Sequence, residues 1–214
     1  MTEQKYALGH DLVQRQVLSS DQLIHMIGEA SQTDFETGVL LFEDFSIEDG
    51  CFLSSKLLSD LSIAEIHFRT TTFRQGLFIK GRGATVCVES CESPEVGISD
   101  AVEAISVIDC RFGKLELFEG KNVELQLRDA HVRHVVLGGS IRSTHRDGFS
   151  LTCDVLDWQV TELSSVNSGT PLIDMEGIRV REKIRTNSVT WAKYFQLSHP
   201  NIPIIYTGPL KDLG

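Results

Sequence analysis

The histidines at positions 131 and 134 are the side chains of this sequence whose spacing most suggests metal chemistry. His145 and Asp147 follow downstream, so four potential N and O ligands fall in one segment, and zinc needs three or four that converge. His131 is expected to point outward from a short strand and His134 to lie at a corner, so their rings need not meet. We therefore predict no metal site and no cofactor.

Cationic side chains gather around the same histidines and would suit an anion. From 111 to 146 the sequence holds seven Lys and Arg against four Asp and Glu, although the whole chain has a formal net charge of −10. Arginine and protonated histidine bind anions through charge-assisted hydrogen bonds. A solvated basic surface and an anion or ligand patch are the two interpretations left open, and the patch would consist of Arg111, Lys114, His131, Arg133, His134 and Arg142.

The five cysteines do not form a pattern typical of catalysis or metal binding. Cys87 and Cys91 have three residues between them, whereas redox and zinc pairs usually have two. Cys110 and Cys153 fall at inward positions, where cysteine behaves as a small hydrophobic residue. The sequence also lacks a phosphate-binding loop, a nucleophile elbow and a zincin motif, so we predict no catalytic residues. An odd cysteine count without a dense framework favours the reducing cytoplasm.

These side chains would be positioned by a repeat in which two apolar residues, one residue apart, recur every five positions. This spacing is neither that of an amphipathic helix nor that of a plain alternating strand, and it favours a chain that makes a short strand, turns and repeats, which is a solenoid. Gly120 and Asn122 occupy the one unfilled position and suit a tight corner. The apolar pairs are Ile105/Val107, Cys110/Phe112, Leu115/Leu117, Leu125/Leu127, Ala130/Val132 and Val135/Leu137.

Four such units make a coil of twenty residues, and this length predicts which residues stack. Neighbouring coils would lie about 4.8 Å apart, as paired strands do, so residues 40–163 would give about six coils. The segment 92–100, with its proline, glycine and acids, interrupts the pattern and is expected to form a loop between coils. The stacked pairs would be Phe112 with Val132, Leu115 with Val135, and Leu117 with Leu137.

Three segments, 71–75, 110–114 and 130–134, resemble the pentapeptide-repeat family, in which a Leu or Phe at the centre of each unit follows a small residue two positions earlier. The resemblance implies a right-handed β-solenoid with four five-residue faces per coil, and it implies no functional residues. Leu115 and Leu125 stand where that family has small residues. A less regular right-handed parallel β-helix with three unequal faces is therefore the open alternative.

Both ends of the repeat carry helix signals, as expected for a solenoid that needs caps over its open ends. Ser19 and Gln22 form a capping box before an apolar segment, and a second helix is expected to end before His199. The predicted organisation is an N-terminal cap at 1–36, a β-solenoid at 37–165, and a C-terminal cap and tail at 166–214. The aromatic stripe of the second helix is predicted to be cap core or, alternatively, a partner surface, and it consists of Trp191, Tyr194 and Phe195.

Charge and hydropathy narrow the choice of partners. A net charge of −10 argues against a binder of duplex nucleic acid, and no run of 18 apolar residues exists to span a membrane. We predict a non-enzymatic, cytoplasmic β-solenoid scaffold for protein–protein interaction that self-associates as a homo-oligomer, most simply a homodimer. A small-molecule or carbohydrate-active enzyme is one alternative. An acidic inhibitor or immunity-type protein is another, because residues 29–65 hold nine acids and one base.

Overall fold

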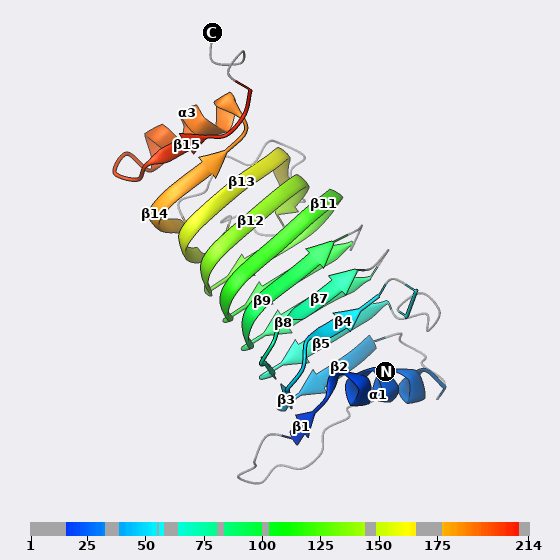
Figure 1. Ribbon diagram of the computed structural model, residues 1–214. Helices are drawn as coiled ribbons and strands as arrows, with labels where there is room; N and C mark the ends of the chain where they lie inside the picture. Colours follow the sequence, from blue (N-terminus) through cyan, green and yellow to red (C-terminus); the bar gives the residue numbers. More distant parts are fainter. Residues whose placement is uncertain are drawn as a thin grey trace.

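Strands that run in the same direction stack to form a rod with one helix at each end (Figure 1). This computed structural model describes residues 16–32, 39–54, 56–57, 64–80, 84–99, 103–143, 149–165 and 177–209, without the side chains of 30–32, 118–122, 143 and 165. The described strands form a parallel β-solenoid of about six turns, which confirms the fold class predicted from the five-residue pattern.

Three ladders of strands form the sides of the coil. The first ladder has five-residue strands in which the second and fourth side chains are buried, because successive side chains of a strand point to opposite faces. Ile66 and Phe68 are such a buried pair. The strands of this ladder are β2 (Val39–Glu43), β5 (Glu65–Arg69), β8 (Thr85–Glu89) and β10 (Ala104–Ile108), followed by the C-terminal half of β11 (Arg111–Arg128).

The second and third ladders begin as separate short strands and then merge. In the coil that contains β9, a single strand pairs with both ladders, and the later strands follow the same bent path. The second ladder begins with β1 (Gln16–Leu18), β3 (Phe45–Ile47) and β6 (Thr72–Phe73), and the third with β4 (Cys51–Leu53) and β7 (Leu77–Lys80). The strands of the merged ladder are β9 (Glu92–Ser99), β11, β12 (Ala130–Ser143), β13 (Leu151–Ser165), β14 (Ile178–Thr186) and β15 (Ile204–Tyr206).

The register between neighbouring coils is the one that the twenty-residue alignment predicts. Leu117 and Leu137 are partners on adjacent strands, and both are buried. The other two predicted pairs are also partners, so all three are confirmed. Their side chains stack into continuous apolar columns, which form one core along the rod. The confirmed pairs are Phe112 with Val132, Leu115 with Val135, and Leu117 with Leu137.

The segment 92–100 does not form the predicted loop. Its described part is strand β9, in which Val96 and Ile98 are buried in the core, while Asp100 lies outside the described residues. Pro94 is tolerated because it falls at the bend between the second and third ladders, where the register of β11 with β9 skips one residue. The prediction was wrong because it treated proline as a loop signal without regard to its place in the coil.

The solenoid also extends further than the predicted range 37–165. β1 pairs with β3 before that range, and β14 and β15 continue the stack after it. Gly120 and Asn122 do not end a strand, since β11 continues through them with register shifts on both sides of Gly120. The corner predicted there is therefore a bend within one long strand.

Both predicted helices are present at the ends of the rod. At α1 (Ser20–Gln32), the backbone N–H of Ser19 donates to Oε1 of Gln22 at 2.8 Å, and the N–H of Gln22 donates to Oγ of Ser19 at 3.2 Å. These reciprocal bonds are the predicted capping box. At the other end, α3 (Val189–Ser198) begins after Ser188, whose side chain accepts a bond from a backbone N–H of the first turn.

Each of five coils turns from the first ladder to the second at a non-glycine residue with positive φ, between 50° and 63°. A side chain with a Cβ is strained in this left-handed region, Asp and Asn least and β-branched residues most. The residue that follows is buried, and Cys91 and Cys110 are examples, with the N–H of Cys91 donating to Sγ of Cys110 at 3.4 Å. The corner residues are Asp44, Thr70, Ser90, Asp109 and Asp129.

Replacing Thr70 by asparagine should stabilise the protein. Thr70 is the β-branched member of the corner series, with φ of 50°, and Thr70→Asn should raise the free energy of unfolding by about 1 kcal/mol because asparagine tolerates this conformation. Urea unfolding measures the effect. Thr85→Asn makes the same change at an outward strand position and should be neutral or destabilising. A loss of stability in Thr70→Asn would contradict the left-handed corner.

Candidate ligand-binding groove

An open groove of about 850 Å³ follows the bend between the second and third ladders. Residues from six successive rungs line it, from β6 to β14, so it extends along the rod axis. One row of lining residues points outward from the second ladder, and the other row lies two positions later, at the bend itself. The titratable and charged residues of the lining are Arg74, Glu92, Arg111, His131, Arg133, Asp154 and Arg181.

Backbone forms the centre of the groove because two neighbouring rungs approach closely there. A Cβ at position 113 would lie 2.4 Å from the carbonyl oxygen of Pro94, a distance that only glycine at that position can avoid. Gly113 therefore contributes only main chain to the floor of the groove, between the rung that carries Pro94 and the rung that carries Arg133. A ligand can approach the main chain at this point.

Three cationic or titratable side chains surround that floor. Arg111 and His131 are partners on adjacent rungs, and Arg133 follows His131 by two residues at the bend. All three are exposed, and neither arginine forms an ion pair with any residue that the structure describes. Nδ1 of His131 lies 3.1 Å from the carbonyl oxygen of Asp129. In the tautomer in which Nδ1 donates to this oxygen, Nε2 is an acceptor.

Acidic side chains flank this centre on the rungs before and after it. Glu92 is the partner of Arg111 on the preceding rung, and Asp154 follows Thr152, the partner of His131, on the next rung. Oδ1 of Asp154 lies 3.5 Å from Nη1 of Arg181, so this carboxylate is partly neutralised. Arg74 and Arg181, on the first and last rungs, form ion pairs, so the arginines of the groove without an ion pair to a described residue are on its two central rungs.

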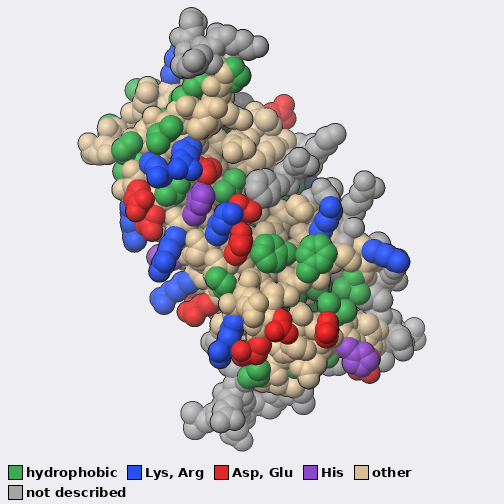
Figure 2. All heavy atoms as spheres, in the orientation of Figure 1, with side chains coloured by type: hydrophobic (Ala, Val, Ile, Leu, Met, Phe, Trp, Pro, Cys, Tyr) green, Lys and Arg blue, Asp and Glu red, His purple; other side chains and the backbone are tan. Residues whose placement is uncertain are grey.

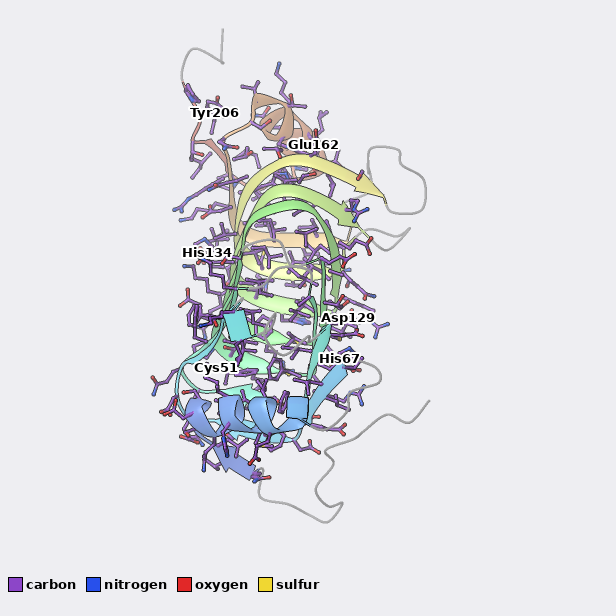
Figure 3. The ribbon with its side chains drawn as sticks, turned by 90° about the vertical axis from the view of Figure 1, so that its right-hand side faces the viewer. Cys51, His67, Asp129, His134, Glu162 and Tyr206 are labelled. Carbon is purple, nitrogen blue, oxygen red and sulfur yellow. The ribbon has the colours of Figure 1, made fainter. Side chains whose placement is uncertain are left out.

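The structure brings together three of the six residues predicted to form an anion patch, and these are Arg111, His131 and Arg133. Arg142 is on another ladder, where its Nη2 lies 3.3 Å from Oε1 of Glu124. Figure 3 places His134 on the side of the rod opposite to Asp129. His134 lines a smaller adjoining hollow of about 350 Å³, which Arg133 also lines.

Lys114 and His134 are close to the groove, but both side chains are paired with carboxylates of the protein itself. Nζ of Lys114 pairs with Glu116 and with Glu95, and the hydrogen bond to Glu116 is the largest cause of the raised pKa of this lysine. Nε2 of His134 lies 2.8 Å from Oδ2 of Asp157. Basic and acidic side chains are similarly interspersed over the face shown in Figure 2. Arg111 and Arg133 differ from Lys114 and His134 because neither arginine has an ion-pair partner among the described residues.

One of the three residues in the aromatic stripe of α3 lies in the core, and the other two pack against the core half-buried. Phe195 is fully buried, and its ring centroid lies 5.6 Å from that of Trp158. Trp191 is half-buried and packs edge-on against Trp158 at 5.3 Å, and Tyr194 is half-buried beside it. The structure therefore corrects the partner-surface alternative for Phe195, whose side chain no partner can contact, because it closes the end of the core.

Sequence reasoning missed one arrangement that resembles a nucleophile with its base. His67 on β5 is the strand partner of Cys87 on β8, and Nε2 of His67 lies 2.7 Å from Oε1 of Glu65, although without the alignment of a hydrogen bond. Burial, with a smaller contribution from nearby carboxylates, raises the pKa of Cys87 to about 11, so its thiol stays protonated at neutral pH. The separation of His67 and Cys87 by twenty residues, one coil, was the signal that could have revealed their pairing on adjacent strands.

No group of three or more His, Cys, Asp and Glu side chains gathers into a potential metal site within the described parts of the chain. His145 and Asp147 lie outside those parts, so the prediction of no metal remains a prediction. None of the helices among the described residues has the length and apolar character needed to cross a lipid bilayer.

Comparisons with known proteins returned no matching family model, no matching curated protein and no matching solved structure.

Alkylation of Cys87 should be slow at neutral pH. With a pKa of about 11, on the order of 10⁻⁴ of this thiol is ionised at pH 7, and the rate should rise about tenfold per pH unit below 11. Iodoacetamide labelling of the folded protein, read by peptide mass spectrometry, measures the rate at this residue, with urea-unfolded protein as the reference. Fast labelling at pH 7 that levels off below pH 9 would instead support an activated nucleophile.

Proposed function

We propose that this protein is a non-enzymatic scaffold that binds another protein through the groove around Arg111 and Arg133. The observation that carries this proposal is the pair of exposed arginines without ion-pair partners among the described residues, held on adjacent rungs beside a backbone floor. Guanidinium groups in such a position are suited to anionic side chains of a partner. Because strand pairing fixes the backbone spacing of the two arginines in the free protein, binding loses little additional backbone conformational entropy.

The enzyme alternative has less support. Cys87, the candidate nucleophile nearest to a histidine, has a raised pKa and lies on a different ladder from the groove. His131 has exposed surroundings, and within the described residues no serine, threonine or cysteine is hydrogen-bonded to it. A groove of this kind can hold a ligand without changing it.

The acidic-inhibitor alternative depends on free carboxylates in the N-terminal coils. Several of these carboxylates are already engaged within the protein. Nε of Arg69 lies 3.0 Å from Oε2 of Glu89, its Nη1 lies 3.5 Å from Oε1 of Glu43, and the hydrogen bond to Glu89 is the largest cause of the raised pKa of Arg69. Arg74 similarly pairs with Glu48 at 3.0 Å. Fewer carboxylates are therefore available to bind a basic target than the number of Asp and Glu residues in these coils suggests.

Self-association through the C-terminal end is part of the same proposal. β15 pairs only with β14 among the described strands, and its Ile205 is 41% exposed, while Leu197 of the neighbouring α3 is 84% exposed. A strand edge next to exposed apolar side chains is a surface on which a second copy can dock.

A cytoplasmic location and kinship with pentapeptide-repeat proteins also stay proposals. The kinship is supported by the corner residues at 70, 90, 109 and 129, which are about twenty residues apart.

Affinity isolation with matched baits tests the scaffold function. The immobilised protein should enrich specific proteins from its native cells, and Arg111→Ala/Arg133→Ala should reduce their recovery at least about tenfold, because each arginine would contribute charge-assisted hydrogen bonds. Arg128→Ala removes an exposed arginine on another ladder and should leave recovery unchanged. Quantitative mass spectrometry gives the comparison.

Two outcomes would contradict the proposal. In the first, no protein is recovered in a manner that depends on Arg111 and Arg133. In the second, the purified protein turns over a carbohydrate or acyl substrate and loses that activity in Arg133→Ala, which would make the groove an active site.

A further inference from the structure

Basic and acidic residues follow one another along the groove, and the order of their charges is symmetric about its centre. From β6 to β14, successive rungs carry Arg74, then Glu92, then Arg111 and Arg133 on the central pair of rungs, then Asp154, then Arg181. Glu92 and Arg111 belong to the row on the second ladder, and the other four belong to the row at the bend, so a ligand that contacts Glu92, the central arginines and Asp154 crosses from one row to the other. His131 is the strand partner of Arg111 and precedes Arg133 by two residues on β12. A ligand that complements this order has one anionic group at its centre and a cationic group on each side.

The spacing of the rungs fits one kind of ligand, an extended peptide. Rungs lie about 4.8 Å apart, so Glu92 and Asp154 are each about 7 Å along the axis from the midpoint of the central rungs. In an extended chain, side chains two residues apart point the same way and are about 6.8 Å apart. Residues at positions i, i+2 and i+4 of such a peptide therefore match the acidic, basic and acidic parts of the groove in turn.

We propose that the groove binds an extended peptide segment of the pattern basic–x–acidic–x–basic, with the central carboxylate held between Arg111 and Arg133 and the two basic side chains beside Glu92 and Asp154. The narrow backbone floor at Gly113 lets the peptide lie close to the rungs. This inference rests on the proposed scaffold function and names the chemistry of its partner.

The same order of charges disfavours a uniform polyanion. A chain that carries an anion at every position, such as an acidic polysaccharide or oligoglutamate, would meet Glu92 and Asp154 on either side of the favourable centre. Like charges at such short range are repulsive. Glu92 is exposed and forms no ion pair with a described residue, so its charge is available to discriminate between ligands.

Fluorescence anisotropy with labelled pentapeptides tests the proposal. Lys-Ala-Glu-Ala-Lys should bind at least about tenfold more tightly than Lys-Ala-Gln-Ala-Lys, although the latter carries more positive charge and the protein is acidic. Glu-Ala-Glu-Ala-Glu and the reversed Glu-Ala-Lys-Ala-Glu should bind more weakly than the matched peptide. Arg111→Ala and Arg133→Ala should each weaken the matched peptide about tenfold, whereas Arg128→Ala should not.

Glu92→Gln distinguishes a direct role of this carboxylate in binding from a general disturbance of the fold, which would weaken both peptides. It should weaken the matched peptide and strengthen Glu-Ala-Glu-Ala-Glu, which moves the two affinities in opposite directions. Thermal unfolding of each variant confirms that its fold is retained.

The proposal is overturned if the matched peptide does not bind better than its glutamine control, if Glu92→Gln shifts both peptides in the same direction, or if oligogalacturonate displaces the matched peptide and binds more tightly. If these peptide tests fail while partner recovery still depends on Arg111 and Arg133, only the ligand chemistry is wrong. If recovery from cells fails as well, the scaffold function is wrong too.

Discussion

The parallel backbone pairing between successive coils is the constraint on which the rest of this structure depends. Each rung satisfies its N–H and C=O groups with the rungs before and after it, so the position of a residue within its coil decides its neighbours. Leu117 lies beside Leu137 for this reason, and Arg111 lies beside His131 for the same reason. The register that closes the core also arranges the outer surface.

The outer surface therefore consists of columns of side chains with a fixed spacing. In several of these columns, basic and acidic side chains on neighbouring rungs form ion pairs. Arg69 lies between Glu43 and Glu89, and Lys114 lies beside Glu95. The groove differs because its bend admits a glycine at position 113 and leaves two arginines without ion pairs within the described residues. The selective binding that we propose is then a property of the few rungs that carry these two arginines.

The sequence allowed the core to be predicted well, because apolar periodicity reports burial directly. It predicted the stacking of Leu117 on Leu137 and both capping helices, but it made Pro94 a loop signal, since nothing local says that this residue falls at a bend. Arg111, His131 and Arg133 were predicted together with Lys114, His134 and Arg142, and the two sets differ in their place in the coil and in their pairing with carboxylates. That pairing depends on register, which a linear pattern does not contain.

The central claim is that binding takes place on the two rungs that carry Arg111 and Arg133. Backbone amide chemical shifts of the ¹⁵N-labelled protein, followed during titration with Lys-Ala-Glu-Ala-Lys, locate the binding surface directly. The account predicts shifts concentrated at residues 92–94, 111–113 and 131–133, which are reduced in Arg111→Ala. Shifts concentrated on α3 and β15, or spread evenly over the rod, would contradict it.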